Sequence, residues 1–578
     1  MGDHAPSADG DDGLAYGDRR EATTRELLWE APVEGVGLSV VKETDVPIPM
    51  RDGLELAANV YRPVEPGADP DEVIADCPVI LQATGWGKDI YWGDAEDRFG
   101  EGWPGTGVGY EPGSPPISKR CTFEAEDPHF WVPQGYVLVV LDGRGFGRSP
   151  GAFNGFNSWG RDVHDAVEWA AEREWSNGRV GMSGVSILSI LQYHAAHEDP
   201  PSLAAICPWQ ATPGDLHDHG GITPVLEPSP PDQFPVPRDP AWDAPASTDP
   251  PAPVEKPEDE VFEGITQPAL ICGSWSSHGF FSRGDFRAFR KLSSEHKWLY
   301  NHGREKWATF YDDEAQAFRK GFFDHFLRGT DDRILDVPPV RFEVRDTLRN
   351  WFVRSAADFP LPDTEYRELY LDAEGGGLVE GSVPDDASAV SYDSTANGGA
   401  TFEYTFEEDT SLVGYQRLKL WLTPEDAADG DVFVTVRKLD ADGEEVRFEG
   451  YIAPLSQPAA LGFLRLSHRT LDEEGSTPWN PYLDYDAAPA EVRPGEPVEC
   501  QVPIRASGTF FRAGETLQVE VSGTFMGRDD FEVTYPARYR GETALELGSV
   551  NDGTHTIHAG GEYDSGLLIP EVPLGPEH

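Results

Sequence analysis

Apolar and polar positions follow two different patterns along this chain. Up to about residue 335, short continuous apolar runs, such as residues 79–81 and 137–141, alternate with stretches of helical spacing, such as residues 162–174. Continuous apolar runs are typical of buried central strands, and apolar residues three to four positions apart are typical of helices that pack on a sheet. This order predicts a mainly parallel sheet with helices on both faces.

The second pattern begins after Val337. Short strands with alternating apolar and polar residues, such as residues 417–422 and 432–436, are separated by Gly, Asp and Asn turns almost to the end of the chain. Regular turn spacing of this kind favours a β-sandwich of jelly-roll type. We therefore predict an α/β domain over residues 35–335 and an all-β sandwich over residues 336–578.

Two segments interrupt these patterns. Residues 1–34 are polar and acidic, and we expect a mobile segment with a short helix around residues 25–28. Residues 223–260 are rich in proline and acidic residues, which leaves little room for regular structure. Because this second stretch lies between two predicted core strands, we interpret residues 210–262 as an irregular cap inserted over the sheet.

Composition changes this picture mainly through charge. The 578 residues include 102 acidic and 46 basic side chains, which give a formal net charge of −56, and the acidic residues are spread over the whole length. Evenly spread acid is expected of a halophilic surface, where counterions screen self-repulsion, whereas an acidic interaction domain would concentrate its charge in blocks. No basic stripe exists to bind phosphates, which argues against a nucleic-acid partner.

Other features of the sequence limit the classes of site. The five cysteines are scattered without metal-ligand spacing, so we expect neither a disulfide framework nor a zinc site. The chain shows neither an apolar leader pattern nor an apolar run of about 20 residues, so we expect a cytoplasmic protein without a membrane partner. Residues 215–221 contain ligand types suited to metals, but we favour His217 and His219 as residues that line the cap entrance. No cofactor is expected.

The most informative stretch is WSNGRVGMSGVS at residues 175–186, which is followed by an apolar helical run. A serine on a tight strand-to-helix turn stands clear of the sheet, and the next backbone N–H points at an oxyanion formed there. This pattern predicts Ser186 as a nucleophile and the Ile187 N–H as an oxyanion donor, although the last small residue of the usual G-x-S-x-G is absent. His302 follows an apolar strand and is the candidate general base, but a histidine in such a place is more often a polar loop residue.

Several motifs, taken together and in order, resemble the X-prolyl dipeptidyl-peptidase and cocaine-esterase (CocE/NonD) hydrolases. They are MRDG at 50–53, LDGRGFGRS at 141–149, WSNGRVGMSGVS at 175–186, WSSHG at 275–279, HGREKW at 302–307, GFLRLSHR at 462–469, STPW at 476–479 and FRAG at 511–514. The resemblance extends from about residue 40 to 570. It implies an α/β-hydrolase with an inserted cap and a C-terminal jelly roll, with Ser186 as nucleophile and His302 as base.

This chain departs from the family pattern at important positions. Ser277 stands at the position of the family's catalytic aspartate, and an uncharged hydroxyl cannot stabilise an imidazolium as a carboxylate does. Trp86 stands where the family usually has an oxyanion-hole tyrosine, and its indole N–H is the expected second donor. Ile187 replaces a common tyrosine, and the Pro-rich insertion lacks the helices of a cap. Asp285, eight residues beyond Ser277, is expected to face outward from a helix.

These observations predict a serine hydrolase that cleaves ester or amide bonds, including X-Pro dipeptidyl bonds, in a small-molecule or peptide substrate. Trp86, Ile187 and Phe280 are expected to line an apolar acyl pocket, with His219 near its entrance, so we rank ester hydrolysis above X-Pro cleavage. Two alternatives remain. One is a catalytically impaired relative that binds a ligand, and the other is a glycan- or polymer-binding protein that uses the jelly roll. The sequence leaves the oligomeric state open.

Overall fold

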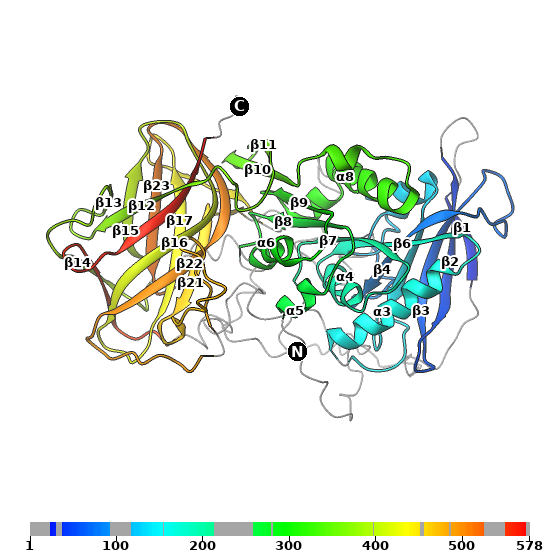
Figure 1. Cartoon of the computed structure of the whole chain (residues 1–578), viewed down its shortest axis with the longest axis horizontal. Helices are drawn as coiled ribbons and strands as arrows, with labels where there is room; N and C mark the ends of the chain where they lie inside the picture. The colour runs from blue at the N-terminus through cyan, green and yellow to red at the C-terminus, as the bar shows by residue number, and fades with distance from the viewer. Residues whose placement is uncertain are drawn as a thin grey trace, which may run out of the picture.

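The computed structural model describes residues 24–29, 37–92, 117–153, 155–212, 258–278, 281–396, 398–450, 456–484, 487–524 and 550–573. In an N-terminal part strands alternate with helices, and beside it lies a C-terminal part built of strands (Figure 1). This change of architecture follows the change of pattern in the sequence.

One sheet extends through the N-terminal part. In spatial order its strands are β1 (Thr24–Trp29), β2 (Ser39–Pro49), β3 (Glu55–Val64), β5 (Val137–Asp142), β4 (Cys77–Thr84), β6 (Ser176–Val185), β7 (Leu203–Trp209), β8 (Ala269–Ser274), β9 (Lys297–His302), β10 (Val340–Thr347) and β11 (Asn350–Ala356). The strands from β5 to β10 run parallel, and the strands at both ends pair antiparallel. The predicted parallel sheet is therefore confirmed.

The first strand corrects one prediction. Residues 25–28, where the sequence suggested a short helix, belong to β1, which pairs antiparallel with β2 in a register that sets Leu27 opposite Val41. A four-residue segment, here two charged residues followed by two leucines, is too short to show a period that separates helix from strand, and the pairing with β2 decides the conformation. Apart from β1, the predicted mobile segment at residues 1–34 lies outside the described residues.

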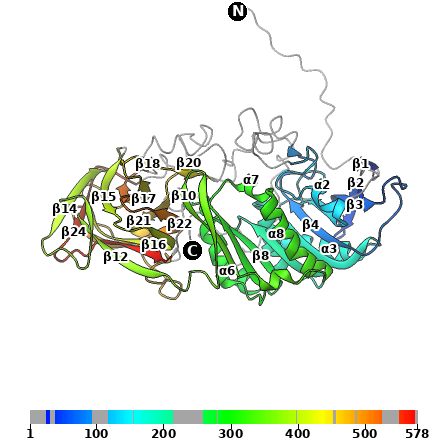
Figure 2. The same ribbon diagram turned by 90° about the horizontal axis from the view of Figure 1, so that it is seen from above.

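Helices cover both faces of the sheet because side chains of the central strands alternate between two cores. Val79 and Leu81 of β4 belong to one core, and Ile80 between them belongs to the other. The first core is covered by α3 (Phe156–Ala171), α4 (Ile187–His197), α5 (Glu258–Glu263) and α6 (Ser282–Lys291). The second core is covered by α2 (Pro128–Trp131), α7 (Lys306–Phe310) and α8 (Asp313–Phe323) (Figure 2).

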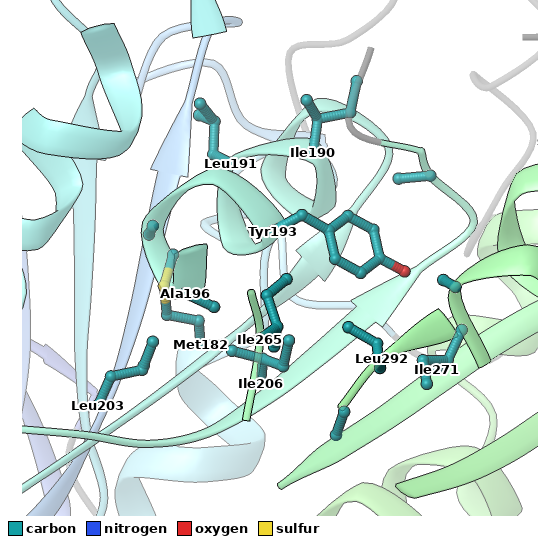
Figure 3. Close-up of a cluster of buried hydrophobic side chains, with 14 of the residues drawn as sticks. Met182, Ile190, Leu191, Tyr193, Ala196, Leu203, Ile206, Ile265, Ile271 and Leu292 are labelled. Carbon is teal, nitrogen blue, oxygen red and sulfur yellow. The ribbon is translucent and has the colours of Figure 1, made fainter. Parts of the chain in front are cut away.

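Helix α4 is the helix that follows Ser186, and it is held by an apolar interface. Figure 3 shows Ile190 and Tyr193 of α4 above Ile206 of β7, with Ile265 and Leu292 beside them. Each such side chain contributes roughly 1.5–3 kcal/mol when it is fully buried. The start of α4 is thus fixed relative to the ends of the parallel strands.

The C-terminal part consists of two layers of antiparallel strands around one core. One layer contains β12 (Glu365–Asp372), β13 (Gly377–Glu380), β14 (Ser388–Asp393), β16 (Thr410–Pro424), β22 (Val498–Phe511), β24 (Thr554–Ala559) and β25 (Gly566–Val572). The other contains β15 (Gly399–Thr405), β17 (Asp431–Leu439), β18 (Glu445–Val446), β21 (Ala460–Arg465) and β23 (Thr516–Ser522).

Strand β10 connects the two parts. Along one side it pairs with β11, and along the other it pairs first with β9 and then with β22, at the Arg345–Thr509 pair. Arg345 is buried at this junction, where it donates hydrogen bonds to the carbonyl oxygens of Ala459 and Gly508, and burial lowers its pKa to about 9. The strand that follows the predicted boundary at residue 335 therefore belongs to both sheets.

Other expectations meet the structure only in part. Of the predicted cap, residues 213–257 lie outside the described residues, and its end contains α5. All five cysteines are buried and free. In the described ranges, no helix is both long and apolar enough to cross a membrane.

Candidate active site

Ser186 occupies a strained turn between β6 and α4. Its backbone has φ +59° and ψ −118°, a conformation that non-glycine residues rarely adopt. Its N–H donates to the carbonyl of Trp209 at 3.1 Å, and its own carbonyl accepts from the N–H of Ile190 at 3.0 Å. This is the strand–serine–helix geometry predicted from the sequence, and it matches a nucleophile elbow.

Two neighbours stabilise this turn. Gly184 has φ +129°, and a Cβ there would lie only 2.6 Å from the Cβ of Leu188, so the position requires glycine. The buried Ser189 hydroxyl donates to the carbonyl of Gly184 at 2.6 Å and accepts from the N–H of Trp209 at 2.7 Å. Sequence reasoning did not assign this role to Ser189, although a lone serine in an apolar helix was an available signal.

The two predicted oxyanion donors, the Ile187 N–H and the Trp86 indole N–H, belong to segments that pack against each other. Ile187 is the first residue of α4, where backbone N–H groups have no acceptor within the helix. A Cβ on Gly85 would lie 2.7 Å from Cδ1 of Ile187, so the loop that carries Trp86 lies against the start of α4. The indole N–H of Trp86 donates to Oε2 of Glu124 at 2.8 Å. Since an indole has a single N–H, the expected second oxyanion donor is engaged by Glu124 here.

His302 is the last residue of β9 and is fully buried. Its Nδ1 accepts from the backbone N–H of Arg304 at 3.2 Å, and its ring stacks on Trp209 with 6.1 Å between centroids. Burial lowers the pKa of His302 well below the ordinary value of 6.5, and the nearby Arg304 and Arg341 lower it further. Among the described residues, no hydrogen bond joins this imidazole to the Ser186 hydroxyl.

The side chain that faces the other ring nitrogen is Gln210. Its amide nitrogen lies 2.8 Å from Nε2 of His302, and its backbone has φ +50° directly after β7. Because Nδ1 accepts a hydrogen bond, the neutral ring carries its proton on Nε2, and the amide must then be turned over so that its oxygen accepts this proton. Gln210 was missed by sequence reasoning, although a polar residue directly after a wholly apolar strand was an available signal.

Ser277 lies in the turn after β8. The register of β8 and β9 sets Ser274 opposite His302, and the N–H of Ser277 donates to the carbonyl of Ser274 at 3.3 Å. The Ser277 hydroxyl accepts from the N–H of Phe281 at 3.3 Å. The turn thus begins beside the proposed base, but within the described ranges no hydrogen bond joins Ser277 to His302.

The expectation that Asp285 faces outward is wrong. Asp285 is fully buried, because the first turn of α6 lies against the end of β7. Its Oδ1 accepts from the backbone N–H of Ala211 at 2.9 Å. Asp285 therefore anchors the residue that follows Gln210.

Phe280 and His219 lie outside the described residues, as does the whole run at 215–221. Within the described part of the chain, no group of three or more His, Cys, Asp or Glu side chains is arranged to hold a metal ion.

Comparisons with known proteins show which proteins this chain is similar to. Residues 52–224 match the family described as X-Pro dipeptidyl-peptidase (S15 family). Residues 333–568 match the X-Pro dipeptidyl-peptidase C-terminal non-catalytic domain. The elbow, the parallel sheet and these two matches define the class: a hydrolase with a second, C-terminal β-domain.

Relatives in full-length alignments give the family. A CocE/NonD family hydrolase from Staphylococcus aureus is 32% identical, with a TM-score of 0.80, and the match covers 97% of this chain and 98% of that structure. Cocaine esterase from Rhodococcus sp. (strain MB1 Bresler) is 25% identical over 92% of this chain and 98% of its own length. An aminopeptidase from a Thaumarchaeota archaeon, at 14% identity, TM-score 0.61 and coverage of 99% and 100%, shares the fold. The chain belongs to the CocE/NonD family of hydrolases.

Proposed function

We propose that this protein is a serine hydrolase of the α/β-hydrolase type that cleaves ester or amide bonds through an acyl-enzyme on Ser186. The strained turn at Ser186 carries the proposal, because it presents the hydroxyl at the C-terminal edge of the parallel sheet. The Ser186 oxygen attacks the substrate carbonyl, its proton goes to His302, and the leaving group departs with that proton. Water then hydrolyses the acyl-enzyme and restores Ser186.

The Ile187 N–H is the proposed oxyanion donor, because it follows the nucleophile and belongs to the first turn of a helix. Trp86 remains the proposed second donor, and in the structure its indole N–H is held at the site by Glu124. Phe280 and His219 remain the proposed substrate contacts, and the C-terminal part is proposed to be a jelly roll.

The proposed base works without a charged partner. Both ring nitrogens of His302 face neutral groups, so catalysis requires the imidazole to exchange one of these contacts for the Ser186 hydroxyl. Ser277 occupies the proposed acid position. Loss of an orienting carboxylate costs up to about 10⁴ in rate and leaves residual catalysis.

These neutral surroundings favour one second candidate: an impaired family member that binds a small acyl or peptidyl ligand. Burial and two arginines hold the pKa of His302 low, which weakens it as a base. In this second candidate, the turn at Ser186 forms part of a ligand-binding site and does not act in catalysis.

Ester substrates are ranked above X-Pro peptides. Ester cleavage requires an apolar acyl pocket, and the half-buried Ile187 side chain supplies apolar surface at the elbow. Turnover of a p-nitrophenyl ester should exceed that of an X-Pro anilide. A clear preference for the anilide would reverse this ranking.

Labelling with a fluorophosphonate probe tests the proposal. Covalent labelling at high salt should occur in the wild type and disappear in Ser186→Ala. Ser176→Ala, at the other end of β6, is the matched control and should label normally. No labelling of the wild type would favour the ligand-binding candidate.

A further inference from the structure

Glu124 lies where three loops of the proposed site meet. The loops are the tryptophan loop (residues 85–88), the elbow (residues 184–187) and the histidine loop (residues 302–307). Glu124 is 1% exposed, and its backbone has φ +63°. A non-glycine residue keeps such a conformation only where its surroundings enforce it.

Each loop is bonded to Glu124 directly. Its Oε2 accepts the indole N–H of Trp86 at 2.8 Å. Its Oε1 accepts from the ammonium of Lys306 and from the indole N–H of Trp307, both at 3.0 Å. Its backbone carbonyl accepts the N–H of Val185, the residue before the nucleophile, at 3.0 Å.

The aromatic packing joins the same loops. The ring of Phe123, next to Glu124, meets Trp86 edge-on with 5.4 Å between centroids, and meets Trp307 in a tilted arrangement with 5.7 Å between centroids. Ring contacts of this kind favour one relative orientation of the rings. Displacement of one loop would therefore disturb both the hydrogen bonds and the packing of the others.

We propose that Glu124 is a positioning residue of the hydrolytic site, which fixes the tryptophan loop, the elbow and the histidine loop relative to one another. This inference rests on the proposed function of Ser186. Glu124 is not proposed to touch the reacting atoms. Lys306 neutralises its carboxylate, so that the buried negative charge does not oppose the oxyanion that develops beside Ile187.

This arrangement predicts an order among three variants. Glu124→Gln removes the charge and one acceptor oxygen, and should slow fluorophosphonate labelling about 10-fold. Lys306→Met leaves a buried carboxylate without its cation, and should slow labelling about 100-fold. The double variant should label faster than Lys306→Met alone, because it has no uncompensated charge. Glu168→Gln, which changes a glutamate that holds Ser202 away from these loops, is the matched control and should label as wild type.

Hydrogen exchange of the full-length protein gives a readout that does not depend on activity. In Glu124→Gln, backbone exchange should rise together in residues 84–92 and 303–311, whereas Trp86→Phe should raise it in residues 84–92 alone. The proposal is overturned if exchange in Glu124→Gln rises only around residue 124, or if the double variant labels no faster than Lys306→Met. An unlabelled wild type would contradict the proposed function, and exchange would still decide whether Glu124 fixes the loops.

Discussion

Ser186 and His302 lie in opposite electrostatic surroundings. Two buried carboxylates that belong to residues bonded to the end of β6 pair with cations: Glu126 with Arg319, and Glu124 with Lys306. Around His302 the ring nitrogens face the neutral Gln210 amide and a backbone N–H, and the nearby arginines lower its pKa.

This difference separates two requirements of a hydrolytic site, a fixed nucleophile and a base that takes up its proton. Ion pairs and hydrogen bonds fix the strained turn. In the described part of the chain, the charged groups that shift the pKa of His302 are arginines, which lower it, and not a carboxylate, which would make the ring a stronger base. Geometry and proton transfer can therefore be tested by different substitutions.

Removal of the buried ion pair that holds the strand before Ser186 should have the largest effect in free energy. Arg319 is fully buried and donates to Glu126, which also accepts from the Ser183 hydroxyl at 2.6 Å. Arg319→Met should lower the free energy of unfolding by about 3–5 kcal/mol, because it leaves a buried carboxylate unpaired. Urea unfolding measures this loss. The control is Arg333→Met, which breaks the exposed pair with Asp331 and should change the free energy of unfolding little. If Arg319→Met changes it no more than this control does, the buried pair contributes little to stability.

Introduction of a carboxylate near His302 should have the next largest effect, and it should act on catalysis. Ser277→Asp should raise kcat/KM by roughly 30- to 1,000-fold, which corresponds to about 2–4 kcal/mol of imidazolium stabilisation. Steady-state kinetics at fixed high salt measures the gain.

Gln210→Glu tests where that charge belongs. It places a carboxylate against Nε2, where a stronger hydrogen bond would hold the ring in its present contact, so kcat/KM should stay level or fall. A gain in Gln210→Glu would assign the acid position to residue 210. No gain in Ser277→Asp, with Ser186 still essential, would contradict the assignment of residue 277.

Salt should have the smallest effect, and it should act on the surface rather than on the site. With a net charge of −56, self-repulsion weakens as the screening length shortens to ~3 Å near 1 M salt. The thermal midpoint should rise by several degrees between low and molar KCl, equivalent to about 1–3 kcal/mol. A flat profile in a thermal melt would show that local pairing already balances the acidic residues, and would refute the halophilic assignment.

The sequence predicted those features that depend on local pattern. Apolar runs located β4 and β5, and the glycine and serine spacing located the turn at Ser186, because each is set by neighbours in sequence. The β1 strand was missed because its conformation depends on pairing with β2.

The contacts of the site were harder to predict. Gln210 meets His302 across 92 residues and Glu124 meets Lys306 across 182, and no spacing rule connects positions so far apart. The burial of Asp285 likewise depends on how α6 packs against the segment that follows β7, so its helix position alone suggested an exposed residue.

The titration of His302 tests the central comparison most directly. Because its pKa lies below the ordinary 6.5, the ring should remain neutral as the pH falls through 6.5. Carbon-13 NMR of histidine-labelled protein, with the signal assigned by its loss in His302→Asn, should show no titration of this ring between about pH 8 and 5.5. A midpoint at or above 6.5 would contradict the account, because it would mean that a carboxylate faces the imidazole after all.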